Sequence, residues 1–184
     1  MKPRMTVDEV VLLKKYYGKA KSYFEWGTGG STVLADMYEN IQDIYSVESD
    51  QQWIDNVGSF LKNNKTTFYY IDINAGEWGS PKDRSKIDNW PNYSNSVASP
   101  GKLFDLVLID GRFRVACAAM AYHYLTDSGV LLVHDYTHDR KYYHVIEELY
   151  AITERANNLV VLEKREKLEA KAEALYNEYK LKQE

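Results

Sequence analysis

The chain has 184 residues, enough for one domain with one core, and its hydrophobic fraction of 45% is ordinary for a globular protein. No apolar run is long enough to span a membrane, and the N-terminus lacks the apolar core of a signal peptide, so we expect no membrane partner. The formal net charge of -4, without a dense basic stripe, argues against a nucleic-acid partner. The single cysteine, Cys117, excludes an intrachain disulfide and a cysteine-rich zinc site, and a reducing, cytoplasmic location is expected.

The first part of the chain alternates between helical and strand-like patterns. Apolar residues at helical spacing follow Thr6, a candidate N-cap. Helices are predicted at residues 6–17, 31–38 and 50–62, and strands at residues 22–26, 43–48 and 66–71. Strands that alternate with helices are typical of βαβ crossovers in a parallel sheet.

A long irregular segment follows, from about residue 73 to residue 102. It holds most of the prolines and three of the glycines, together with Trp78, Trp90 and Tyr93. Loops of this length inside a compact domain are uncommon and are often functional lids. The three aromatic side chains either line or close a binding pocket, or pack as a small satellite core.

Regular patterns return in the last third of the chain. Residues 104–109 (FDLVLI) are almost all apolar, as expected for the buried centre of a parallel sheet. Helices are predicted at residues 115–125 and 142–152, and strands at residues 130–133 and 159–162. The fold class is therefore α/β, with a Rossmann-like, doubly wound and mainly parallel sheet.

The C-terminal residues differ from the rest in composition. Residues 163–184 are dominated by lysine, arginine and glutamate, which predicts a charged helix added to a domain at residues 1–162. An apolar stripe runs along this helix at 4-3-4 spacing, and its members are Leu168, Ala172, Leu175 and Tyr179. The stripe packs on the domain or pairs with a second copy, which leaves a homodimer open.

A glycine-rich turn, Gly27-Thr28-Gly29-Gly30, joins the first strand to the next helix. Glycines let a backbone turn sharply and approach a ligand closely, and a helix that starts there presents free N–H groups. Such a turn alone fits any nucleotide-binding fold. Glu25, two residues before the turn, suits a ligand with positive groups better than a pyrophosphate.

Acidic residues recur where the predicted strands end. Glu48 ends the second strand, where an acid can accept hydrogen bonds from both hydroxyls of a ribose. Asp72 and Asp110 follow two further strands, and ligands of open α/β sheets bind at these carboxyl ends. Each acid alone is as easily a cap or turn residue, but together with Glu25 they favour a cationic ligand.

The stretches FEWGTGGST, YSVESD, YYIDIN and FDLVLIDGRFR resemble motifs I to IV of class I S-adenosylmethionine (SAM) dependent methyltransferases, over about residues 20–162. The combination of IDGR with Val133-His134-Asp135 resembles glycan O-methyltransferases, such as the methyltransferase domains of chlorovirus glycan-building enzymes and plant polysaccharide methyltransferases. The resemblance implies a SAM-dependent O-methyltransferase that acts on a hydroxyl of a sugar, glycan or other small polar acceptor.

The resemblance implies that the cofactor's methionine part lies on the first motif, its ribose at Glu48 and its adenine near Asp72. The implied cofactor-binding residues are Glu25, Gly27, Thr28, Gly29, Gly30, Ser31, Thr32, Glu48, Ser49, Trp53, Asp72, Ile73 and Asp110. The sequence departs from the family in two places. Ser31 replaces the usual third glycine, and the usual pair of antiparallel C-terminal strands is not evident, since only residues 159–162 read as a strand.

Methyl transfer to a hydroxyl needs alignment of the acceptor and a group that removes its proton. We expect His134 or Asp110 to take the proton, Asp135 to orient its partner, and Arg112 to hold the acceptor. A backbone-satisfied loop histidine and a structural ion pair are equally plausible readings of these residues. Asp110 and Asp135 could instead ligate a divalent cation, and no metal site is assigned.

Two other classes of function stay open. A nicotinamide-dependent oxidoreductase predicts GxGxxG, but Thr32 occupies the last glycine position and Glu25 would have no role. A non-catalytic module of the same fold would bind the cofactor, or nothing, without methyl transfer. Base N-methylation is disfavoured because Ile-Asp-Gly-Arg stands where those enzymes carry an Asn/Asp-Pro-Pro-aromatic motif.

Overall fold

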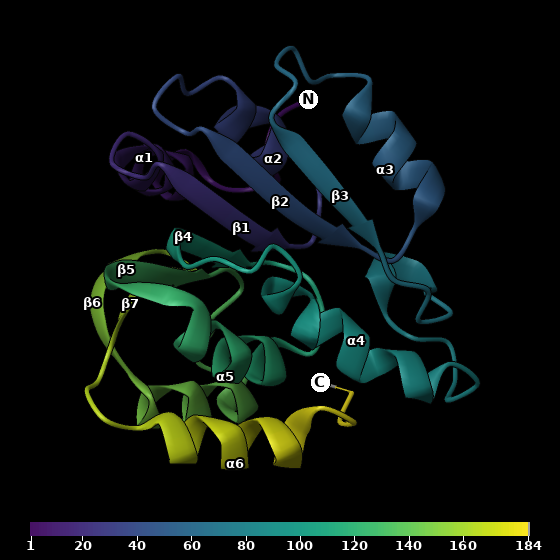
Figure 1. The fold of residues 1–184 in the computed structure, drawn as a ribbon, viewed down its shortest axis with the longest axis vertical. Helices are drawn as coiled ribbons and strands as arrows, with labels where there is room; N and C mark the ends of the chain where they lie inside the picture. The colour runs from purple at the N-terminus through teal and green to yellow at the C-terminus, as the bar shows by residue number, and fades with distance from the viewer. Residues whose placement is uncertain (184) are drawn as a thin grey trace.

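The computed structural model describes residues 1–183. The strands are β1 (Ser22–Trp26), β2 (Asp43–Glu48), β3 (Thr66–Tyr70), β4 (Phe104–Ile109), β5 (Leu125–Val133), β6 (Tyr150–Ala156) and β7 (Leu159–Lys164). They form a seven-stranded sheet in the order β3-β2-β1-β4-β5-β7-β6 (Figure 1). The first five strands are parallel, and β7 is antiparallel to both β5 and β6. The predicted α/β, mainly parallel fold is confirmed.

Helices cover both faces of the sheet (Figure 1). The α-helices are α1 (Val7–Tyr17), α2 (Gly30–Asp36), α3 (Gln51–Gly58), α4 (Trp90–Asn95), α5 (Arg114–Tyr124) and α6 (Glu169–Tyr179). Short 3₁₀ helices are η1 (Glu77–Gly79), η2 (Ile87–Asn89), η3 (Ser96–Ala98) and η4 (Lys141–Glu148). No helix in residues 1–183 combines the length and the apolar character that a membrane span requires.

The core has two halves, one on each face of the sheet, because successive strand residues point to opposite faces. Leu106 and Leu108 of β4 belong to the half beneath α1, while Val107 and Ile109 belong to the half beneath α5. Thr6 caps α1 as predicted, and its hydroxyl accepts a hydrogen bond from the backbone N–H of Glu9. This cap fixes where the helix begins.

The C-terminal helix packs on the domain, which was one of the two alternatives. Ala172 and Leu175 of α6 are buried in the same half of the core as α5, and Leu168 and Tyr179 pack against it. The backbone N–H of Leu168 also donates to the hydroxyl of Tyr122 in α5 at 3.0 Å. The last residue of the predicted tail, 184, lies outside the described residues, and a homodimer and a boundary at residue 162 stay predictions.

Three sequence predictions differ from the structure. The helix predicted at residues 142–152 is η4, which ends at Glu148, and β6 begins at Tyr150. β6 and β7 form the antiparallel pair that the sequence did not reveal, joined by Asn157-Asn158, with Asn157 in the left-handed region at φ 48°. The segment predicted to be irregular at residues 73–102 contains α4 and three 3₁₀ helices.

Candidate functional site

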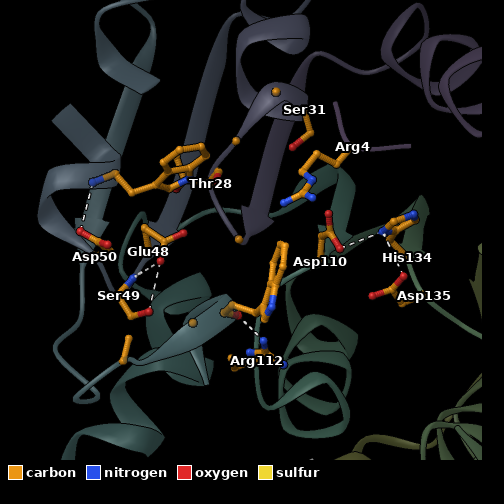
Figure 2. Close-up of a pocket in the computed structure, with 18 of the residues that line it drawn as sticks. Arg4, Thr28, Ser31, Glu48, Ser49, Asp50, Asp110, Arg112, His134 and Asp135 are labelled. Carbon is orange, nitrogen blue, oxygen red and sulfur yellow. Dashed lines mark hydrogen bonds and ion pairs between the residues drawn. The ribbon is translucent and has the colours of Figure 1, made fainter. Parts of the chain in front are cut away.

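A cavity of about 1010 Å³ lies where the parallel strands end, and residues that end or follow four of these strands line it. Gly27 follows β1, Glu48 ends β2, Asp110 follows β4 and His134 follows β5. This edge is where open α/β sheets bind their ligands. In Figure 2, Glu48 and Ser49 lie on one side of the cavity, and the group around Asp110 lies on the other.

The glycine turn lies close to the backbone of Asp110 and Gly111, the two residues that follow β4. Gly27 has φ +97°, and a Cβ atom on it would lie 2.7 Å from the backbone nitrogen of Gly111. Only glycine combines this conformation with this approach. The four residues of the turn and the following Ser31 line the cavity as expected.

Glu25 does not line the cavity, which corrects the prediction that its carboxylate faces the ligand. Its side chain is 0% exposed and accepts hydrogen bonds from four hydroxyl groups. The donors are those of Tyr23 (2.7 Å), Ser31 (2.8 Å), Ser46 (2.9 Å) and Thr32. Burial raises the pKa of Glu25 to about 7, although the four hydroxyls lower it. The carboxylate of Glu25 therefore links β1 to β2 and to the start of α2 by hydrogen bonds.

Glu48 faces the cavity from the end of β2. The backbone N–H of Ser49 donates to its Oε1 at 2.6 Å, and burial raises the pKa of the carboxyl. A desolvated carboxylate gains from additional donors, such as the two hydroxyls of a ribose. Beside it, the indole N–H of Trp53 donates to the carbonyl of Thr28 at 2.7 Å, which ties α3 to the glycine turn. Ser49 and Trp53 also line the cavity, as predicted.

Asp110 and His134 meet on the opposite side. Ile109 and Val133 are register partners in the parallel pair β4–β5, so the residue after each strand lies beside the other. Nδ1 of His134 lies 2.9 Å from Oδ1 of Asp110. His134 is only 8% exposed, whereas the Asp110 side chain is 30% exposed toward the cavity.

Glu9 is a member of this group that the sequence analysis missed. Its side chain is 2% exposed, and its Oε2 lies 3.5 Å from Nε2 of His134. The backbone N–H groups of Thr6 and Asn158 donate to the same carboxylate at 2.7 and 2.9 Å. Burial lowers the pKa of His134, but Asp110, Asp135 and Glu9 together raise it above its ordinary value. The imidazole thus has a carboxylate at each nitrogen.

Asp135 lies in an ion-pair network. Its Oδ2 lies 3.1 Å from Arg140 and 3.4 Å from Arg114, and Arg114 also lies 3.6 Å from Oδ1 of Asp110. Asp110, His134 and Asp135 offer ligand atoms within 4.8 Å of one another, as a metal site would. The guanidinium groups beside Oδ1 of Asp110 and Oδ2 of Asp135 would repel a cation bound there, so the arrangement fits a metal ion poorly.

Arg112, the remaining predicted catalytic residue, lines the cavity beside Trp78. Its guanidinium donates to the carbonyl of Trp78, and the guanidinium of Arg4 lies 4.6 Å from the centre of the Trp78 ring. Trp78 is 73% exposed and has φ 57°, a conformation that strains a bulky residue. Tyr93 also lines the cavity, whereas Trp90 is buried against Phe113.

Three further predicted cofactor residues lie outside the cavity lining. Thr32 is buried, and its hydroxyl bonds to Glu25. Asp72 pairs with Lys86 at 3.1 Å on the surface, and Ile73 is a core residue. Like Glu25, none of these three residues faces the cavity.

Comparison with solved structures gives the nature of the fold. A methyltransferase-like protein from Silicibacter pomeroyi DSS-3 is 27% identical, with a TM-score of 0.86 over 98% of this chain and 97% of that chain. The MycE methyltransferase of the mycinamycin biosynthetic pathway, solved with Mg, S-adenosylhomocysteine (SAH) and mycinamycin VI, is 12% identical, with a TM-score of 0.53 over 84% of this chain and 47% of that one.

The N-methyltransferase NodS from Bradyrhizobium japonicum WM9 is also 12% identical, with a TM-score of 0.52 over 85% of this chain and 94% of that one. No protein-family model matches the chain, and no curated protein matches its sequence. The similar solved structures are class I SAM-dependent methyltransferases, and the chain has their fold.

Proposed function

We propose that the chain is a SAM-dependent O-methyltransferase that acts on a hydroxyl of a sugar or another small polar acceptor. One observation carries the proposal. One cavity lies at the carboxyl ends of the parallel strands. Glu48, whose carboxylate can accept hydrogen bonds from ribose hydroxyls, lies on one side of it, and the pair Asp110 and His134 lies on the other. The glycine turn lies between the two sides, where the methionine part of the donor would join them.

The cofactor side offers a partner for each part of the donor. Glu48 accepts the ribose hydroxyls, the turn from Gly27 to Ser31 supports the methionine part, and Trp53 packs beside the turn. When bound, SAM would supply a methyl group whose bond to the sulfonium sulfur breaks as the acceptor oxygen bonds to the methyl carbon, and the sulfur would keep the electron pair of the broken bond. The chain's own residues must therefore bind, align and deprotonate the acceptor.

Asp110 is the better of the two candidate bases. Both nitrogens of His134 already face carboxylates, and the ring is almost completely buried. Asp110 presents its carboxylate to the cavity, so it can accept the hydroxyl proton as the oxygen forms its bond to the methyl carbon. His134 then positions Asp110, and Arg112 binds the acceptor.

Calorimetric titration with SAH and with NAD tests the cofactor part of the proposal. We expect SAH to bind and NAD not to bind, because Thr32 occupies the position of the last glycine in the dinucleotide-binding GxGxxG pattern. Transfer from methyl-labelled SAM to a panel of sugars and sugar acids tests the reaction. Tight NAD binding, or SAH binding without transfer to any hydroxyl acceptor, would contradict the proposal.

The variant Asp110→Asn tests the assignment of the base. We expect the chemical step to slow by about a hundredfold or more, with SAH affinity nearly unchanged. Asp127→Asn makes the same change at an exposed position near the start of β5, remote from the cavity end of that strand, and serves as the control. Equal losses of SAH affinity and rate in Asp110→Asn would show a structural role instead.

A further inference from the structure

Not all arginines that line the acceptor side of the cavity have an ion-pair partner. Asp110 and Asp135 are engaged by Arg114 and Arg140, whose guanidinium groups lie within 3.6 Å of their oxygens. Two more arginines, Arg4 and Arg112, line the same cavity. Neither forms an ion pair with any carboxylate in residues 1–183. Two guanidinium groups therefore line this cavity without a carboxylate at ion-pair distance, and the other acids of the lining, Glu48 and Asp50, lie on the ribose side (Figure 2).

Arg112 is the more constrained of the two. It lies in the loop between β4 and α5, its backbone N–H lies 3.3 Å from the hydroxyl of Tyr93, and its guanidinium donates to the carbonyl of Trp78. Burial lowers the pKa of Arg112, and the nearby cations of Arg114 and Arg140 lower it further. A partly buried guanidinium among like charges is costly to keep unless an anion completes its surroundings.

Arg4 reaches the same region from the N-terminal segment. Its guanidinium stacks over the ring of Trp78, while Arg112 holds the carbonyl of that residue. Two cations thus converge on one exposed aromatic residue at the cavity. Figure 2 shows Arg4 and Arg112 on opposite sides of the space between Glu48 and Asp110.

We propose that the acceptor carries an anionic group, a carboxylate or a phosphate close to the methylated hydroxyl, and that Arg112 binds this group. This inference rests on the proposed function and deepens it. SAM itself brings a sulfonium, an ammonium and one carboxylate, so its carboxylate can balance at most one of the two arginines. At least one of the two guanidinium groups then remains free to pair with an anionic group of the acceptor. The guanidinium fork matches both carboxylate and phosphate oxygens, and Trp78 offers a flat apolar surface for the rest of the acceptor.

Calorimetry on the full chain saturated with SAH tests the inference, with glucose, glucuronate and glucose 6-phosphate as probes. These sugars differ only in the group at C6, which is neutral, a carboxylate or a phosphate. We expect at least one of the two anions to bind about tenfold or more tightly than glucose, and the preference to weaken as salt is added. Which anion binds identifies the source of the charge. Equal binding of all three sugars, or no binding of either anion at millimolar concentration, would overturn the inference.

Arg112→Gln should abolish the preference for the anion while SAH still binds. Arg84→Gln removes the same charge from an exposed arginine outside the cavity lining and should keep the preference. A preference that survives in Arg112→Gln would also overturn the assignment. If SAH itself does not bind to the wild-type chain, the proposed function fails; if SAH binds and the sugars are not distinguished, only the anionic acceptor fails.

Discussion

Replacing the buried carboxylate beneath the glycine turn should change how stability depends on pH. Burial raises the pKa of Glu25 from 4.5 to about 7. Between these values the folded chain binds a proton that the unfolded chain has lost, so the free energy of unfolding falls as pH rises. A shift of this size corresponds to about 3 kcal/mol when the group is fully ionised, since each pKa unit is worth about 1.4 kcal/mol. The variant Glu25→Gln cannot ionise and should lack this loss.

Urea unfolding of both proteins at about pH 5 and about pH 8 measures the effect, and we expect the wild type to lose about 2 to 3 kcal/mol more than the variant between them. For a chain of 184 residues this is a difference of roughly 5 to 10 °C in melting temperature. Glu173→Gln, at an exposed position of α6, is the control and should behave as the wild type. Identical pH dependence in wild type and Glu25→Gln would refute the reasoning.

The other predictions concern the cavity and its walls. SAH affinity should fall as pH is lowered through the raised pKa of Glu48, because a protonated carboxyl accepts fewer ribose hydrogen bonds, and calorimetry on Glu48→Gln should show no such fall. Gly27→Ala should destabilise the chain by more than about 1 kcal/mol, measured by urea unfolding, and by more than the control Gly101→Ala. Both glycines have positive φ, but only at Gly27 would the new Cβ atom collide with backbone atoms. Glu9→Gln should lower the pKa of His134, measured by NMR titration of the imidazole, because one of the carboxylates that raise it is removed. Chelation of divalent cations should leave SAH affinity and transfer unchanged, because arginines already engage the carboxylates beside the histidine; a loss restored by Mg²⁺ would contradict this.

The mainly parallel sheet and two acids at the cavity could be predicted from local patterns. Buried parallel strands read as apolar runs, and the residue after such a run lies at the ligand-binding edge. This argument places Glu48 and Asp110 correctly. It fails for Asp72, because β3 ends at Tyr70 and the chain then turns to the surface, where Lys86 pairs with the acid.

The prediction that Glu25 faces the ligand fails because a residue's position along a strand does not alone decide whether its side chain reaches the cavity. The face of the sheet to which the side chain points also matters. All five residues of β1 are buried, so an acid among them points into the protein. A signal for this was present. The hydroxyl groups of Tyr23, Ser31, Thr32 and Ser46 lie on β1 and on the two elements that follow it, and they supply the partners that a buried carboxylate needs.

The missing strand and the missing acid had different causes. Residues 150–156 alternate only partly between buried and exposed, because β6 is an edge strand, and a helical spacing of apolar residues precedes it. The Asn157-Asn158 pair between two β-rich runs was the available hairpin signal. Glu9 was visible as the end of a capping box, but its pairing with His134 spans most of the chain and leaves no local pattern.

The cap of α1 has a consequence for the dynamics of the molecule. The same carboxylate closes the first turn of the helix, holds the backbone of Asn158 and faces the imidazole of the site. Fraying of this helix end therefore exposes Nε2 of His134, and a ligand that favours the ordered site must also suppress the fraying. Amide hydrogen exchange in the first turn of α1 thus reports, from outside the cavity, on whether the cavity is filled.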